Sequence, residues 1–200
     1  MAEMVVKVEG VTPTASGAMS VANTITTPIY VAQGMVPGLN IYTALVGEAP
    51  GVVAANNFMS IFNPISSGKI FIVYQFVCFP YAGAASTATA NMNVHRVTAA
   101  SGGTLRAASD INKFVTTEPN SVAEVRTGNP TVTILGTTPI LAIPPAITSA
   151  GSGVSATVNI IPPSGAVFHV LPGEGIVART TAGDVDQLWS LGFTWGEATL

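Results

Sequence analysis

Charged side chains are scarce in this sequence of 200 residues. Asp, Glu, Lys and Arg make up 8% of it, against about 25% in typical soluble domains. The seven basic and ten acidic residues leave a net charge of −3. A surface that binds nucleic acid needs clustered Lys and Arg. We therefore expect no nucleic acid among the direct partners of this protein.

Cysteine and histidine, which build many catalytic and metal sites, are also rare. The single cysteine, Cys78, cannot form a disulfide within the chain and has no basic neighbour in sequence that would lower the pKa of its thiol. The two histidines, His95 and His169, lie too far apart in sequence for a zinc-finger pair, and no Gly-x-Ser-x-Gly motif marks a nucleophilic serine. The sequence therefore predicts no catalytic, cofactor-binding or metal-binding residue, and a protein that is not an enzyme.

Three short motifs allow a functional interpretation but fit a turn better. Ser66–Lys69 is similar to the end of a phosphate loop, yet Ile70 stands where Ser or Thr would bind magnesium. Asp184 and Asp186 offer two oxygens to a calcium ion that takes roughly six to eight ligands. Glu174 lies in a Pro-Gly-Glu-Gly run that precedes an expected strand. We interpret all three as turns.

No apolar run is long enough to cross a membrane as a helix. The most apolar stretch, Ile70–Ala85, has 16 residues and contains Gln75 and Pro80, whereas a spanning helix needs about 20 residues. The first ten residues lack the basic and apolar regions of an export signal. We expect neither export by that route nor a membrane partner.

Short runs of β-branched and aromatic residues dominate the sequence. Lys69–Phe79 is apolar on both alternating faces, as in a central strand, and Gln187–Trp195 alternates large apolar with smaller residues. Ala90–Val97 alternates in the way of a strand with one wet side, on which His95 would lie. Twenty glycines and fourteen prolines leave little room for helices, and only Ser109–Phe114 is expected to form a helical turn.

Further strands are expected between turn residues. They are Asn57–Phe62, Val122–Arg126, Ile140–Ile143, Ser155–Ile161, Ala166–Leu171 and Gly175–Thr180. Many short strands without amphipathic helices between them favour antiparallel pairing. We predict an all-β fold, an antiparallel β-sandwich of the jelly-roll kind with an N-terminal extension.

The first 55 residues differ from the remainder. No charged side chain occurs from Gly10 to Gly47, and Pro and Gly interrupt every apolar run there. We divide the chain into an N-terminal extension or arm, residues 1–55, and a β-sandwich domain, residues 56–200. The arm is expected to bind an adjacent subunit, so that a chain without residues 1–50 still folds but assembles poorly. The alternative is that this region supplies edge strands to its own sandwich.

A second uncharged stretch points to assembly. Thr127–Phe168 contains no charged residue in 42 positions. Such a surface on a free monomer risks association through apolar patches or strand edges, and burial against other subunits removes that risk. We therefore expect a homo-oligomer. The alternative is a monomer that hydroxyl, amide and backbone groups keep in solution.

Several short segments resemble structural proteins of tailed bacteriophage particles. They are Asn63–Lys69, Arg96–Thr104, Glu124–Arg126, Asn129–Pro130, Leu171–Ile176, Arg179–Gly183 and Gln187–Ser190. The resemblance spans about residues 56–197 and implies a non-enzymatic virion structural protein. More specifically, it implies a capsid decoration (cement) protein, made in the host cytoplasm, that stabilises the phage head as a homotrimer bound to the major capsid protein or other virion subunits.

The alternative function is a tail or fibre-associated jelly-roll module that binds a host receptor or glycan. Sugar sites often combine an exposed aromatic ring with acidic and amide groups. Trp189 or Trp195 could supply the ring, and Asp184, Asp186 and Gln187 the polar groups. The shared face of both tryptophans with other large apolar residues instead favours a position in the core.

Overall fold

The computed structural model describes residues 39–50, 56–82, 91–143, 158–160, 168–181 and 187–200. These residues form thirteen strands and one short 3-10 helix, η1. The elements are β1 (Asn40–Pro50), β2 (Asn56–Phe62), β3 (Lys69–Ala82), β4 (Met92–Ser101), β5 (Thr104–Leu105), η1 (Ala108–Asp110), β6 (Asn112–Lys113), β7 (Glu124–Thr127), β8 (Thr131–Ile134), β9 (Leu141–Ile143), β10 (Val158–Ile160), β11 (Phe168–Val170), β12 (Gly175–Thr180) and β13 (Gln187–Thr199). In this part of the chain, no helix has the length and apolarity that crossing a membrane requires.

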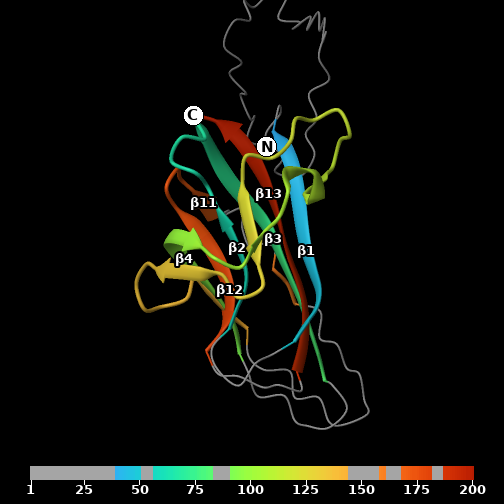
Figure 1. The fold of residues 1–200 in the computed structure, drawn as a ribbon, viewed down its shortest axis with the longest axis vertical. Coiled ribbons are helices and arrows are strands. Elements are labelled where there is room, and N and C mark those ends of the chain that lie inside the picture. The colour runs from blue at the N-terminus through green and yellow to red at the C-terminus, as the bar shows by residue number, and fades with distance from the viewer. Residues whose placement is uncertain (1–38, 51–55, 83–90, 144–157, 161–167, 182–186) are drawn as a thin grey trace, which may run out of the picture. The chain divides into compact units, whose positions relative to one another are not determined.

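The strands form two antiparallel sheets that pack face to face (Figure 1). Sheet A has the order β10-β3-β13-β1-β6, and β11 also pairs with β3. Sheet B has the order β5-β7-β2-β12-β4-β8, and β9 also pairs with β4. The antiparallel sandwich predicted from the sequence is confirmed.

The strand order follows a nested pairing of the two halves of the chain. β1 pairs with β13, β2 with β12, β3 with β10 and β11, and β4 with β8 and β9. Strands β1 to β4 alternate between the two sheets, and so do their partners. A chain that pairs from its ends inward across two sheets is a jelly roll. This nested order brings turns that are distant in sequence together at the ends of the sandwich.

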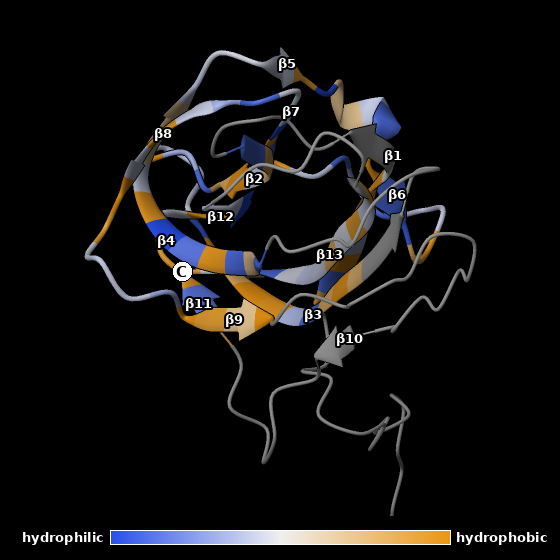
Figure 2. Cartoon of the chain, turned by 90° about the horizontal axis from the view of Figure 1, so that it is seen from below, coloured by the Kyte–Doolittle hydropathy of each residue, from blue (hydrophilic) through white to orange (hydrophobic). Residues whose placement is uncertain are grey.

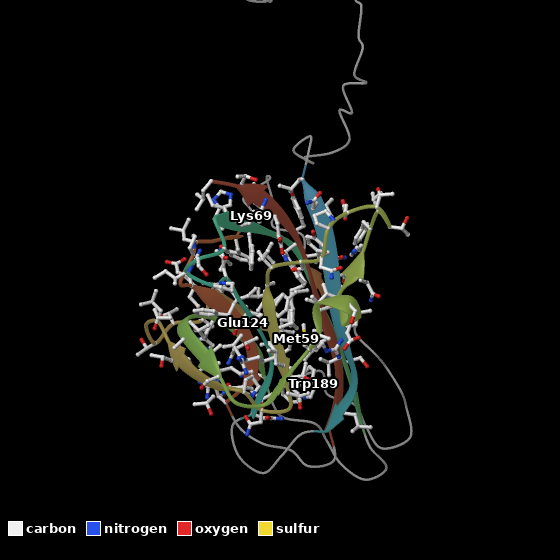
Figure 3. All side chains as sticks on the ribbon, turned by 45° about the horizontal axis from the view of Figure 1, so that its top comes forward. Met59, Lys69, Glu124 and Trp189 are labelled. Carbon is white, nitrogen blue, oxygen red and sulfur yellow. The ribbon has the colours of Figure 1, made fainter. Side chains whose placement is uncertain are left out.

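The core consists of the inner faces of both sheets. On β13, the side chains of Trp189, Leu191, Phe193 and Trp195 are all fully buried, as the alternating sequence predicts. Met59 of β2 belongs to the same core cluster as Trp189, and Figure 3 labels both side chains. Each large apolar side chain contributes roughly 1.5–3 kcal/mol to folding when it is fully buried.

Strand β3 changes phase halfway along its length. The pairing with β13 skips Tyr74, because Val73 lies opposite Trp195 and Gln75 opposite Thr194. Before this bulge Phe71 and Val73 belong to the core cluster, and after it Phe76 and Cys78 do. The simple alternation expected for Lys69–Phe79 is therefore wrong in its second half.

Strand β1 moves the start of the sandwich to residue 39. The sequence analysis assigns Asn40–Pro50 to an arm, but β1 pairs with β13 along most of its length and also with β6. Tyr42 and Ala44 are fully buried in the core. The predicted boundary at residue 56 is wrong for this strand, while residues 1–38 and 51–55 lie outside the described part of the chain. Pro50 is the last residue of the strand, so it ends β1 instead of preventing it.

Sheet B curls over its own outer face. β4 lies beside β12 at Val97, where Val97 pairs with Gly175, and the chain reaches the far edge of the sheet at Thr104, which pairs with Thr127 of β7. In the strand order of sheet B, β4 and β5 are separated by four strand spacings, roughly 19 Å. Because sheet A covers the inner face, the chain crosses the outer one, and Figure 2 shows β5 and β8 outside the layer of β2, β12 and β4.

Two glycines allow this crossing. Gly102 and Gly103 have φ values of 60° and 58°, in the left-handed region that favours glycine. A Cβ on Gly103 would also collide with the backbone carbonyl oxygen of Thr127. The pair forms the turn between β4 and β5.

The curl buries polar residues that the sequence pattern assigns to solvent. His95 is 5% exposed and Asn93 is 7% exposed, although both lie on the predicted wet side of β4. Ser60 of β2 is also fully buried. The prediction that His95 faces solvent is wrong. Alternation along one strand carries no information about a distant segment that folds over it.

Candidate functional site

The first and the last described residues lie at the same end of the sandwich. At this end β1 begins, with Asn40 opposite Glu197, and β13 finishes, with Thr199 opposite Lys69. The β2–β3 turn, the β11–β12 turn and the segment between β6 and β7 meet there as well. We call the terminal end the set of residues 39–41, 63–69, 114–123, 171–174 and 197–200 (Figure 1).

Exposed apolar side chains concentrate at the terminal end. Nine large apolar side chains are exposed among the described residues, and six of these nine belong to the terminal end. The six are Ile65 (83% exposed), Leu200 (66%), Phe114 (59%), Val115 (53%), Leu171 (47%) and Val122 (39%). Scattered exposed apolar residues are normal, whereas their concentration on one surface is typical of an interaction site.

Asn63 joins the two turns that carry Ile65 and Leu171. Its backbone N–H donates to the carbonyl of Glu174 at 2.8 Å, and the N–H of Gly173 donates to the carbonyl of Asn63 at 2.8 Å. Its side-chain Nδ2 donates to the carbonyls of Lys69 at 2.8 Å and Val170 at 3.0 Å. Asn63 thus fixes both turns to the start of β3 and to the end of β11.

Glu174 and Arg96 hold the β11–β12 turn from its other side. The carboxylate of Glu174 accepts from the backbone N–H of Leu171 at 3.3 Å and lies 3.5 Å from Nη1 of Arg96. The same nitrogen of Arg96 donates to the carbonyl of His169 at 2.8 Å. The turn expected around Glu174 is confirmed, and its carboxylate serves to fix the loop that carries Leu171.

The C-terminus is attached to the same group of turns. The N–H of Leu200 donates to the carbonyl of Gly68 at 3.0 Å, and Nζ of Lys69 donates to Oγ1 of Thr199 at 2.8 Å. Figure 3 labels Lys69 near this end of the ribbon. Within Ser66–Lys69, Oγ of Ser67 accepts from the N–H of Lys69 at 3.1 Å. These residues form the predicted turn, which connects β2 of sheet B to β3 of sheet A.

Glu197 anchors the segment that carries Phe114, Val115 and Val122. Its carboxylate is 3% exposed. It accepts hydrogen bonds from Oγ of Ser121 at 2.5 Å, the N–H of Val122 at 3.2 Å and Nε1 of Trp195 at 3.3 Å. Three neutral donors thus satisfy a buried carboxylate and attach the segment to the end of β13.

Tyr42 and Glu118 attach the same segment to β1. The hydroxyl of Tyr42 donates to the carbonyl of Pro119 at 2.9 Å, and the N–H of Ile41 donates to Oε1 of Glu118 at 3.3 Å. Burial, followed by the nearby carboxylates of Glu197 and Glu118, raises the pKa of Tyr42 to about 12. The phenol therefore remains a hydrogen-bond donor at neutral pH.

The terminal end is thus a fixed framework that presents apolar side chains to solvent. Polar groups of these residues hold backbone in place instead of converging on a reaction centre. Such an arrangement suits binding to another apolar surface, and its preset geometry lowers the entropy lost on binding.

A second group of polar residues lies on sheet B, where the chain from Val97 to Thr104 crosses its outer face. Several of their buried nitrogen and oxygen atoms have no hydrogen-bond partner within the structure: Asn56 Oδ1, Asn57 Oδ1, Ser60 Oγ, both ring nitrogens of His95, Arg126 Nε and Arg179 Nε. Burial, and then the positive charge of Arg179, lower the pKa of His95. This arrangement favours the neutral imidazole, and sequence alternation alone could not reveal it.

The other residues considered from the sequence are not brought together. Cys78 is buried in the core, as predicted, and burial raises the pKa of its thiol. His169 lies in β11, where its ring is exposed. The carboxylates of Asp184 and Asp186 belong to the undescribed segment 182–186, so the calcium and turn interpretations of these two residues stay predictions.

Both tryptophans considered for a sugar site lie in the core. Trp189 and Trp195 are fully buried, and their rings pack against Phe58 and Tyr42 with centroids 6.4 Å and 5.9 Å apart. The core position favoured by the sequence is confirmed. Neither ring is exposed to stack against a sugar. The glycan site suggested for the receptor-binding alternative therefore has no aromatic ring from these two residues.

One cavity of the described residues is small. A cavity of about 10 Å³, roughly one water molecule in size, lies between the sheets and is lined by Val73, Phe76, Phe168 and Phe193 among others. In the same ranges, no group of three or more His, Cys, Asp or Glu side chains is placed to hold a metal ion.

Comparisons with known proteins give no match. No family model, no curated protein and no solved structure is significantly similar to this chain.

Proposed function

We propose that this protein is a non-enzymatic structural subunit of a tailed-phage particle, in the role of a capsid decoration protein. The observation that carries the proposal is the concentration of six exposed apolar side chains on one fixed end of a jelly roll. The low charge of the chain and the resemblance of its turns to phage structural proteins support the same role. The fold itself occurs in viral capsid proteins but also in lectins and cupins, so it supports the proposal only by analogy.

A decoration protein stabilises a phage head by mass action. A protein that binds the assembled lattice but not its free subunits lowers the free energy of the assembled state. The effect is repeated over many equivalent sites, and an oligomer that contacts several lattice subunits at once gains further from its multivalency. A trimer matches the local threefold positions of a head lattice, and this is the oligomer that we propose.

The test compares phage particles with and without this protein. Particles that lack it should rupture at a lower temperature, measured by release of encapsidated DNA during a thermal ramp. Addition of the purified protein should restore the original rupture temperature. An unrelated protein of similar mass and charge, added at the same concentration, serves as the control. Equal rupture temperatures with and without the protein would overturn the proposal.

A further inference from the structure

We infer that the terminal end binds the N-terminal segment of a second copy of this chain, so that the protein assembles by exchanging residues 11–38 between subunits. The inference concerns the purified protein and is independent of the proposed role in a phage particle. It rests on an apolar surface, on the composition of the segment, and on the point at which the segment joins the sandwich.

The terminal end offers an uncovered apolar surface on a fixed backbone. Ile65 is 83% exposed, and its Cγ1 would lie 3.9 Å from a Cβ placed on Gly173, in the turn that follows Leu171. Leu200 is bonded through its N–H to the turn that holds Ile65. The backbone segments that carry Ile65, Leu171 and Leu200 are thereby held next to one another. Exposed apolar side chains that gather on one surface are typical of an interaction site.

Residues 11–38 have the matching composition. This segment has no charged side chain, and it contains nine large apolar residues: Val11, Met19, Val21, Ile25, Ile29, Tyr30, Val31, Met35 and Val36. Exposure of so many apolar groups to water is unfavourable. Pro13, Pro28 and Pro37 remove backbone donors and keep the segment from forming a long strand of its own. A segment of this kind gains most from an existing apolar surface.

The segment joins the sandwich at the terminal end itself. β1 begins at Asn40 and runs away from that end, so Leu39 is the point of attachment. Leu39 is fixed there because its side chain contacts Gly196 on β13. A chain of 28 residues reaches up to roughly 90 Å when it is extended, which is enough to cross to a neighbouring subunit.

The partner is a second copy because the surface of this chain favours burial against other subunits. Thr127–Phe168 contains no charged residue, and such a surface is typical of one that a neighbouring subunit covers. Pro37 and Gly38 are a dipeptide typical of turns, just before the attachment point, which allows the segment to leave its own sandwich toward a neighbour. Docking of the segment on its own subunit would leave a monomer, and the sedimentation test distinguishes that outcome.

The test measures the mass of the full-length protein and its variants by sedimentation at dilute concentration. The surface variant is Ile65→Ser/Leu171→Ser, and the segment variant is Ile29→Asp/Val31→Asp. The matched control is Leu105→Ser/Leu135→Ser, because these two leucines are 52% and 51% exposed but lie outside the terminal end. The melting temperature of each variant is measured to confirm that its sandwich is folded.

We expect the full-length protein and the control to sediment as the same oligomer. The surface and segment variants should each shift at least tenfold in dissociation constant toward the 20.3 kDa monomer. A full-length protein that is a monomer would overturn the inference, as would a surface variant with the mass of the control. If the oligomer data agree but particles are not stabilised, only the proposed function fails.

Discussion

At the scale of single residues, the ionisation of His95 should make the stability of the sandwich depend on pH. Burial and the charge of Arg179 lower the pKa of His95 below its usual 6.5. The unfolded chain therefore binds a proton at a higher pH than the folded chain does. The free energy of unfolding should fall as the pH drops below 6.5, until the lowered pKa of the folded state is passed.

The variant His95→Phe should remove this part of the pH dependence. Melting temperatures at several pH values between 7.5 and 5.5 measure it, and His169→Gln serves as the control because that side chain is exposed. The control should lose as much stability on acidification as the wild type does. If His95→Phe loses the same amount, the ionisation of His95 contributes nothing.

Cys78 should be unreactive in the folded protein. Its side chain is fully buried, and burial raises the pKa of the thiol, so the reactive thiolate is suppressed. We expect a maleimide reagent to label Cys78 only at denaturant concentrations that unfold the sandwich. Rapid labelling in the absence of denaturant would show that β3 opens locally or that the thiol is accessible.

At the scale of elements, Glu197 attaches the segment before β7 to the end of β13. Glu197→Ala would leave Ser121, Val122 and Trp195 with buried donors and no acceptor, which should lower the free energy of unfolding by roughly 3 kcal/mol. Glu197→Gln keeps an acceptor and should cost less. The control is Glu124→Ala, which breaks only the partly exposed ion pair with Arg126, an effect of about 0–1 kcal/mol. Equal losses for Glu197→Ala and Glu124→Ala in a denaturant titration would contradict this role.

Two truncations distinguish the contribution of residues 1–38 to folding from that of β1. Removal of residues 1–38 leaves β1 intact, and we expect the remaining chain to fold with a cooperative thermal transition. Removal of residues 1–50 deletes β1 and uncovers the edge of β13, so we now expect this chain not to fold, contrary to the expectation from sequence alone. Circular dichroism during heating distinguishes the two. A cooperative transition after removal of residues 1–50 would show that β1 is dispensable.

Elements with strong local patterns could be predicted, and those that depend on distant partners could not. β12 has the predicted bounds, and β13 has the predicted inner face, because alternation of large and small residues is a local property. β1 has no clear local signal, because the prolines and glycines around it are typical of residues that interrupt strands. The bulge at Tyr74 has none either, because it becomes visible only in the register between β3 and β13.

The terminal end could not be predicted for a related reason. Its frame depends on contacts such as the one between Asn63 and Val170, which are 107 residues apart. Nested pairing of the strands creates that contact, and no motif in either turn predicts it. The exposure of Ile65 likewise depends on which turns surround it. Composition therefore predicts assembly, which stays a prediction, but it does not indicate which surface is involved.

At the scale of the whole molecule, the fold and the sparse charge are compatible with the role that we propose. A jelly roll closes its core within one domain, so its exposed end is free to contact other subunits. The chain has few charges that could provide long-range attraction, and contacts between its apolar groups act only at short range. Such a protein is suited to a permanent assembly in which each copy has a fixed site.

The most direct test of this role is the imaging of intact phage particles at a resolution that distinguishes strands. The account predicts density that fits the two-sheet sandwich at every equivalent site on the outer surface of the head. The terminal end should lie at contacts between copies, where residues 11–38 of one subunit meet Ile65 and Leu171 of the next. Absence of the protein from the particle, or its presence only at the tail tip, would contradict the proposed decoration role.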